Sequence, residues 1–159
     1  MSDASPGAPA RFDPGVRVEV EELAPAAAKA LRGLEGACRQ TTIARGLLEL
    51  VRLRVAQING CAYCVDLHHR QALEAGEDPR RLAALAAWSE APFFTARERA
   101  ALELAEAETR VSERPVADSV LEGARRHFPE RELAELIWVI AVINTWTRIG
   151  ATARPWRLP

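Results

Sequence analysis

Two cysteines and a histidine follow one another closely in the middle of the chain, as Cys61, Cys64 and His68. If the chain becomes helical at Asn59-Gly60 or just after, these side chains stand at positions i, i+3 and i+7 and share one face of the helix. Both cysteines then lie near the first helical turn, where free backbone N–H groups and the positive end of the helix dipole favour a thiolate. The spacing therefore favours redox chemistry.

Reduction of a peroxide needs a thiolate, a group that handles protons, and a second thiol that closes a disulfide. Cys64 and Cys61 supply the thiols, and His68 lies about one helical turn after Cys64, within reach directly or through one water. Glu49, on the preceding segment, can orient that histidine. Tyr63 can serve as a pocket wall or as a hydrogen-bond donor.

Two other interpretations of the same residues stay open. Cys61, Cys64 and His68 could ligate zinc with His69 or a distant group as the fourth ligand, although structural zinc sites generally draw ligand pairs from separate segments, and the sequence has no second CxxC and no HxxxH. The cysteines could also simply pack, with Glu49 forming an ordinary helical ion pair with Arg45 or Arg52. We expect no bound metal and no cofactor.

The composition narrows the functional class. The chain has 159 residues and a formal net charge of −1, so it offers no basic field for nucleic acid or an anionic membrane. We expect residues 1–15 to form a mobile tail without a signal-peptide pattern, and residues 16–159 to form one domain. The longest apolar run, Leu136 to Ile143, is too short to cross a bilayer, which needs roughly 20 residues. A cytoplasmic protein is expected, and in a reducing compartment closely spaced cysteines are more often catalytic or metal-binding than structural.

The pattern of apolar residues predicts an all-α fold, because they recur at helical spacing and β-branched runs are short. Thr41 or Thr42 is expected to cap the helix that ends at Asn59-Gly60, and Gly76 to cap the one that carries the cysteines. The last helix is apolar almost all round, which predicts that it is buried, here between subunits. The expected helices cover residues 23–34, 43–58 and 61–75, begin again at Asp78-Pro79 and at the capping box Thr95–Glu98, and follow Pro115 and Pro129.

Aromatic and terminal residues receive structural interpretations. Trp88, Phe93 and Phe94 are expected to pack in the core rather than line a substrate entrance. Trp138 and Trp146 are expected in the core or an interface for the same reason. The arginine-rich end, residues 148–157, is expected to be a solvated terminus.

The segment from Glu49 to Arg70 resembles the signature of AhpD-like alkylhydroperoxidases, within the carboxymuconolactone decarboxylase superfamily. Further segments resemble its small, single-domain branch, and together they cover nearly everything after the tail: Gly76–Asp78, Trp88, Phe94–Thr109 and Ile143–Arg148.

This resemblance implies an all-helical homotrimer or homohexamer that acts as a thiol-dependent alkyl hydroperoxide reductase with an antioxidant role. By position, Cys64 is similar to the peroxidatic cysteine and Cys61 to its resolving partner, while His68 and Glu49 match the proton relay. The implied partners are an organic hydroperoxide and an external dithiol, thioredoxin-like or lipoyl electron donor. Two positions depart from the family pattern, since Tyr63 replaces a second relay histidine and Thr147 a common asparagine.

Three alternative functions remain. The same thiols could serve a protein disulfide reductase or a redox sensor. The chain could instead be a non-enzymatic helical oligomer whose cysteines bind zinc or pack. A lactone-type decarboxylase or isomerase is the last alternative, and the resemblance argues against it because the true decarboxylases of the superfamily lack the CxxC pair.

Overall fold

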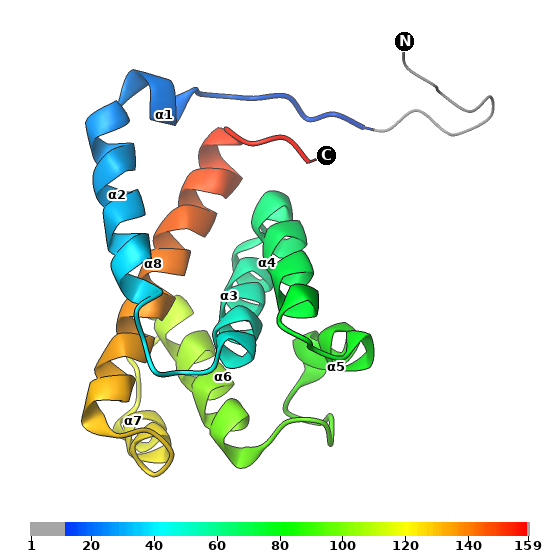
Figure 1. The fold of residues 1–159 in the computed structure, drawn as a ribbon, viewed down its shortest axis with the longest axis vertical. Helices are drawn as coiled ribbons and strands as arrows, with labels where there is room; N and C mark the ends of the chain where they lie inside the picture. The colour runs from blue at the N-terminus through cyan, green and yellow to red at the C-terminus, as the bar shows by residue number, and fades with distance from the viewer. Residues whose placement is uncertain (1–11, 159) are drawn as a thin grey trace, which may run out of the picture.

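The computed structural model describes residues 12–158, and within this range the chain is all-α, as the sequence predicts (Figure 1). Most of the expected tail, residues 1–15, lies outside the described residues. The helices are α1 (Val20–Leu23), α2 (Pro25–Cys38), α3 (Arg45–Asn59), α4 (Ala62–Glu74), α5 (Pro79–Ala84), the short 3-10 helix η1 (Leu85–Ala87), α6 (Ala96–Thr109), α7 (Asp118–Arg125) and α8 (Glu130–Ala153).

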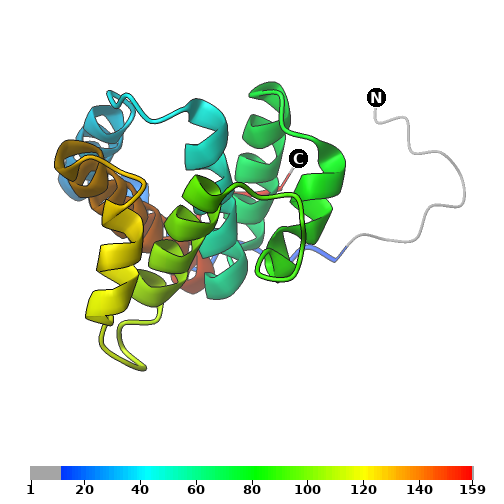
Figure 2. The same ribbon diagram turned by 90° about the horizontal axis from the view of Figure 1, so that it is seen from below.

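Helix α3 is the centre of the packing. It lies between α8 and α4, with α6 against another of its sides, and α2 runs along α8 (Figures 1 and 2). Its side chains Leu50, Val51 and Val55 are fully buried. Because α3 contacts the core on several sides, its C-terminal end is held firmly where the cysteine turn begins.

Several local signals act as the sequence predicts. The Asp78 carboxylate accepts the backbone N–H of Arg80 at the start of α5, and Thr95 and Glu98 form a complete capping box on α6. Gly60 and Gly76 adopt left-handed backbone angles, with φ of 69° and 88°, where a side chain would be strained. The predicted breaks on either side of α4 are therefore confirmed.

The first long helix differs from the prediction of residues 23–34. Leu23 belongs to α1 and is 76% exposed, while α2 continues through Gly33 and Gly36 to Cys38. A glycine inside a helix costs only about 1 kcal/mol. Burial of Cys38 in the main core favours the longer helix, because tertiary packing outweighs a cost of that size.

Two predicted helix starts are also wrong. Neither Thr41 nor Thr42 caps α3, which begins only at Arg45 with Ala44 as its N-cap. The Thr41 hydroxyl accepts the backbone N–H of Ile43 and donates to Glu135 of α8 at 2.6 Å, and the Thr42 hydroxyl donates to Glu132 of α8 at 2.8 Å. The helix expected directly after Pro115 begins at Asp118. Residues 115–117 stay irregular there, and Val116 packs against the core.

Helix α8 is the helix among residues 12–158 whose length and apolar composition would suffice to cross a membrane, but half of that apolar stretch is buried within the protein. Leu136 and Ile140 are fully buried, as in the core helix of a soluble protein. On the opposite side, Ile137 is exposed and Trp138 is 58% exposed. The contact between subunits expected along this helix stays a prediction.

The aromatic connection before α6 packs as predicted. Phe94 is buried, and Trp88 and Phe93 pack against the same apolar cluster as Leu82. The guanidinium of Arg99 fixes the connection by donating to the backbone carbonyls of Trp88, Ser89 and Ala91. These aromatic residues therefore serve the core and line neither pocket described below.

Glu108 on α6 gives a test of the fold. Burial raises the pKa of this carboxyl to about 7, and no cation contacts it among the described residues. A carboxyl whose pKa is higher in the folded state loses stability as the pH rises from about 4.5 to 7. Glu108→Gln removes this penalty and should therefore raise the free energy of unfolding at pH 8. The gain should be only about 1 kcal/mol, because the carboxyl is partly exposed. The gain should shrink at pH 5 in urea titrations, whereas Glu103→Gln, at an exposed site of the same helix, should change neither value. An equal gain at both pH values would contradict the assignment.

Candidate functional site

The turn between α3 and α4 positions the cysteines. Asn59 ends α3, Gly60 takes the left-handed conformation, and Cys61 is the N-cap of α4, with its sulfur accepting the backbone N–H of Cys64 at 3.3 Å. Cys61 and Cys64 form a disulfide with their Cα atoms 5.3 Å apart, and they are only 2% and 3% exposed. Both sulfurs therefore lie at the positive end of α4 and away from bulk water.

A buried polar network fixes this turn to α8. The Asn59 side-chain amide donates to Asn144 Oδ1 at 2.9 Å and to Thr147 Oγ1 at 2.8 Å. Asn144 in turn donates to Thr109 Oγ1 and accepts from Arg148. Thr147, which replaces an asparagine common in the resembled branch, is fully buried and its hydroxyl both donates and accepts. The polar groups at the end of α3 are thus satisfied, and the turn has a defined position.

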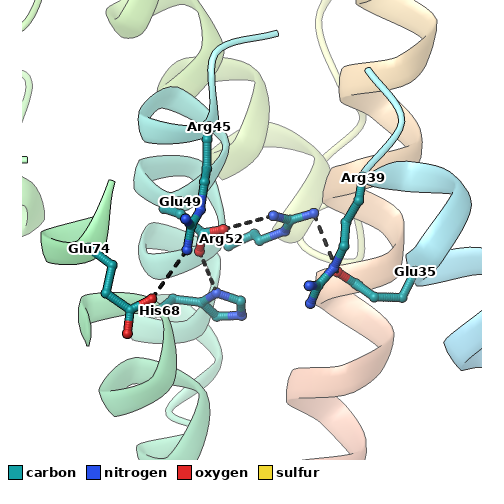
Figure 3. A network of polar contacts seen from close by, with 7 residues as sticks. All are labelled: Glu35, Arg39, Arg45, Glu49, Arg52, His68 and Glu74. Carbon is teal, nitrogen blue, oxygen red and sulfur yellow. Dashed lines mark hydrogen bonds and ion pairs between the residues drawn. The ribbon is translucent and has the colours of Figure 1, made fainter. Parts of the chain in front are cut away.

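His68 and Glu49 form a buried pair across α4 and α3. His68 Nδ1 lies 2.8 Å from Glu49 Oε2, and Arg52 Nη1 donates to Glu49 Oε1 at 3.0 Å (Figure 3). Burial by itself raises the pKa of Glu49, but the hydrogen bond from His68 and the Arg52 guanidinium outweigh it and hold the pKa below its ordinary value. An ionised carboxylate only accepts, so Nδ1 of His68 is the protonated nitrogen and a neutral ring keeps Nε2 free to act as a base.

Arg52 extends the network to α2. It is the ion-pair partner that the sequence offered for Glu49, and its Nη2 also lies 3.4 Å from Glu35 Oε1. Arg39 donates to the same Glu35 oxygen at 3.3 Å, while Arg45 pairs with Glu74 of α4 instead of Glu49 (Figure 3). One chain of charges therefore connects the histidine to the helix on the far side of the site.

Two pockets flank the disulfide. The first has a volume of about 500 Å³, and Cys64 and His68 both line it. Its walls are largely aromatic and aliphatic, and charged side chains stand among them. Besides the two site residues, it is lined by Glu21, Arg32, Glu35, Gly36, Arg39, Tyr63, Leu67, Ile143, Trp146 and Trp156. We refer to it as the Cys64 pocket.

The second pocket, of about 890 Å³, is lined by Cys61 and not by Cys64. We refer to it as the Cys61 pocket. Tyr63 and Trp156 line both pockets and stack with their ring centroids 5.2 Å apart, so they form a partition between them. The Cys61 pocket is further lined by residues 12–15, Gly60, Ala62, Asp66, Gly150, Ala151, Arg154, Arg157 and Leu158.

Sequence reasoning missed Gly150 and Trp156. A β-carbon at position 150 would lie 2.6 Å from Cys61 Sγ and 3.0 Å from the Trp156 ring, so α8 can touch the disulfide only with a glycine there. Trp156 lies in the terminus expected to be solvated, yet its indole N–H donates to Glu21 at 2.8 Å and its ring contacts the site. A lone glycine inside a long helix was the one available signal of close approach.

The five predicted site residues converge around the disulfide, each in a distinct place. Cys64 and His68 share one pocket, Glu49 lies behind His68, Cys61 faces the other pocket, and Tyr63 stands between the two. A buried histidine–carboxylate pair therefore lies on the Cys64 side of the disulfide only.

Residues 25–107 match the model of the carboxymuconolactone decarboxylase family, and the chain belongs to that family. It is 38% identical to the uncharacterized protein YdfG of Bacillus subtilis (strain 168), over 84% of this chain and 91% of the relative. It is 34% identical to the uncharacterized protein YnjA of Escherichia coli (strain K12), over 64% of this chain and 56% of the relative.

Solved structures agree with the fold. A protein of unknown function from Agrobacterium tumefaciens, suggested to be the antioxidant defence protein AhpD, superposes with a TM-score of 0.87 at 31% identity, over 91% of this chain and 99% of that one. An uncharacterized peroxidase-related protein from Ralstonia eutropha JMP134, with an alkylhydroperoxidase AhpD core, gives 0.76 at 19% identity over 87% and 74%, which bears on the fold alone. The AhpD-like family and the CxxC pair fit an antioxidant, peroxidase-like role.

Replacing Gly150 tests how tightly the disulfide packs on α8. Gly150→Ala should lower the free energy of unfolding of the oxidised protein by about 1–3 kcal/mol, because the new methyl overlaps Cys61 Sγ. Gly33→Ala is the matched control, since nothing lies within 4 Å of its new β-carbon, and it should raise stability by up to about 1 kcal/mol. Guanidinium titrations of both variants, kept oxidised, make the comparison. Stabilisation by both substitutions would contradict the contact.

Proposed function

We propose that this protein is a thiol-dependent hydroperoxide reductase in which Cys64 is the peroxidatic residue. The observation that supports this most is that Cys64 and His68 line one pocket while Glu49 holds the far nitrogen of the histidine. A nucleophile, a base and a group that orients the base are the parts that activate a thiol. Among the described residues, no histidine lines the other pocket, which Cys61 faces, and the two carboxylates among its lining residues, Asp13 and Asp66, are each paired with an arginine.

In the first step, His68 Nε2 takes the proton of the Cys64 thiol, and the thiolate attacks one oxygen of the hydroperoxide. An S–O bond forms and the O–O bond breaks. The leaving alkoxide receives the proton from His68 and departs as an alcohol. Cys64 becomes a sulfenic acid, and Glu49 stabilises the histidine while it is charged.

In the second step, the Cys61 thiol attacks the sulfur of the sulfenic acid, which releases water and forms the Cys61–Cys64 disulfide. The two residues are already bonded in the structure, so the fold accommodates that product. An external dithiol then restores both thiols and leaves as a disulfide. Overall, one peroxide and one dithiol give one alcohol, one water and one disulfide.

The walls of the Cys64 pocket support an organic rather than an inorganic peroxide. Trp146, Trp156, Leu67 and Ile143 offer apolar surface, which favours an alkyl or aryl group beside the reacting oxygens. The charged side chains of the lining include two arginines and two glutamates besides His68, so the pocket has no strong preference for an anion or a cation. Hydrogen peroxide would leave most of this surface unused.

Tyr63 is proposed as a wall and not as a proton relay. Its ring stacks on Trp156, and no described residue forms a hydrogen bond with its hydroxyl. A phenol is also a poor base near neutral pH. The relay in this protein then consists of His68 and Glu49 alone.

The alternatives differ in what they require of the cysteines. A reductase for protein disulfides, or a sensor, must present a sulfur to a folded partner, whereas both sulfurs here are almost fully buried. Zinc binding needs free thiolates. If zinc binding were the function, metal analysis of the reduced protein, purified without chelator, would detect about one zinc per chain. A decarboxylase would keep its activity without either cysteine. The expected trimer or hexamer and the cytoplasmic location stay predictions.

Serine substitutions separate the roles of the two cysteines. Cys64→Ser should abolish consumption of cumene hydroperoxide by the reduced protein. Cys61→Ser should allow one turnover and then accumulate a sulfenic acid, because no thiol resolves it. Peroxide loss and sulfenic acid trapping with dimedone measure the two effects. Full turnover by Cys64→Ser would refute the proposed function.

Substitutions of His68 and Glu49 by uncharged amide residues test the proposed proton relay. His68→Asn should slow the single-turnover reaction of the reduced protein with cumene hydroperoxide by about 10²–10⁴-fold, and Glu49→Gln by about 10²-fold. Glu74→Gln, the same change at an exposed ion pair with Arg45, should have no effect. Because Glu49→Gln also weakens a buried charge pair, circular dichroism must first establish that the variant is folded. The same single-turnover rate should also be measured as a function of pH. If its pH dependence is unchanged by Glu49→Gln, the glutamate has a purely structural role.

A further inference from the structure

We propose that the Cys61 pocket is a separate binding site for the reducing dithiol, and that the dithiol attacks Cys61. This inference rests on the proposed function and concerns its reductive half. The observation behind it is that the two sulfurs of one disulfide face different pockets, divided by the Tyr63–Trp156 partition. Hydroperoxide and reductant would then reach the same centre by different routes.

Attack at Cys61 gives the better leaving group. The external thiolate forms a bond to Cys61 Sγ, the Cys61–Cys64 bond breaks, and Cys64 leaves as a thiolate on the side of His68 and within the first turn of α4. The helix terminus favours a thiolate at that position, and His68 beside it can take up a proton that offsets the negative charge. The second thiol of the reductant then attacks its own mixed disulfide, which releases Cys61. The two protons of the reductant end on Cys61 and Cys64, and the reductant leaves as a cyclic disulfide.

Arg154 favours the attacking form of the reductant in this pocket. It is half-buried, lines the pocket, and forms no ion pair within the described range, whereas Arg157 lies 4.0 Å from Asp13. Its left-handed backbone, with φ of 47°, ends α8, and Trp156, Arg157 and Leu158 beyond it line the same pocket. The two carboxylates that line the same pocket, Asp66 and Asp13, are paired with Arg70 and Arg157. The unpaired guanidinium of Arg154 therefore stabilises a thiolate over a thiol on the way to Cys61.

The burial of Cys61 indicates a slender reductant. Cys61 is 2% exposed and borders a pocket of about 890 Å³; α8 lies against its sulfur at Gly150, and Trp156 packs against the apolar cluster that contains Cys61. A thiol on a short flexible chain can enter a space of that size. A thiol on a folded protein surface would first have to displace residues 154–158. We therefore assign the pocket to a small, flexible dithiol.

Two phenylalanine substitutions, one in each pocket, test the assignment. Ala151→Phe narrows the Cys61 pocket from an exposed position of α8, and Gly36→Phe narrows the Cys64 pocket from an exposed position of α2 where nothing lies within 4 Å of a new β-carbon. The two half-reactions are measured apart: dithiothreitol reduces the oxidised protein without peroxide, and cumene hydroperoxide oxidises the reduced protein without dithiothreitol. Ala151→Phe should slow only the reduction, by at least about 10-fold, and Gly36→Phe should slow only the oxidation.

Equal slowing of both half-reactions by Ala151→Phe, or a slower reduction in Gly36→Phe, would overturn the assignment. Arg154→Gln should slow reduction several-fold, and Arg154→Lys should recover part of the loss. If neither the parent nor any variant consumes hydroperoxide, the proposed function fails, while the rates of disulfide reduction still decide which pocket the dithiol enters.

The attacked sulfur can be identified directly. The oxidised protein is treated with 2-mercaptoethanol, quenched with acid, alkylated and sequenced by mass spectrometry. The adduct should be on Cys61 and the alkyl group on Cys64, and the reverse pattern would overturn the proposal. A second measurement tests the size of the reductant. The rates at which dithiothreitol and reduced thioredoxin reduce the oxidised protein are each divided by the rate at which the same reductant reduces a small aromatic disulfide, which corrects for intrinsic reactivity. A larger normalised rate for thioredoxin would contradict a slender reductant.

Discussion

The site depends on the burial of one carboxylate. Glu49 is 3% exposed, and a buried charge costs several kcal/mol unless partners compensate it. His68 satisfies one of its oxygens and Arg52 the other, and the charge of Arg52 is shared with Glu35. Because these partners come from α2, α3 and α4, the compensation also fixes how the helices pack (Figure 3). The histidine is therefore oriented by an interaction that the fold itself needs.

A second constraint acts from the C-terminal side. The amide of Asn59 fixes the end of α3 to α8, and one turn further along α8 the bare backbone of Gly150 contacts the disulfide. Trp156 then returns across the site and is held by Glu21 of α1. Segments from the start and the end of the described chain thus pack against the cysteine turn. This packing explains how two sulfurs in a short loop remain almost fully buried.

Much of this arrangement could be predicted from the sequence, because its determinants are local. Helical spacing, the capping box at Thr95 and the left-handed glycines Gly60 and Gly76 each act within a few residues. The pairing of Glu49 with His68 required only that two consecutive helices meet at the CxxC, as they do. The family resemblance added the roles of these residues, which the spacing alone left open.

What could not be predicted depends on contacts between distant segments. Thr41 and Thr42 are good capping residues, but their hydroxyls donate hydrogen bonds to nearby glutamates of α8 instead, and α3 starts later in the chain. Trp156 lies among arginines and looks like part of a solvated end. It is held in the site by Glu21 and Tyr63, neither of which is near it in sequence. Local chemistry offers candidates for a contact, and tertiary packing chooses among them.

The difference between the two cysteines is of this second kind. Cys61 and Cys64 lie at the same helix terminus, so the field of α4 alone barely distinguishes them. The two cysteines differ in the residues that pack around them: His68 lies on the side of Cys64, and Gly150 and Arg154 lie on the side of Cys61. A symmetric pair of thiols would react with peroxide and reductant at either sulfur. Under the proposed function, the Tyr63–Trp156 partition removes that symmetry, and the aromatic residue that stands where the resembled pattern has a second relay histidine forms part of this partition.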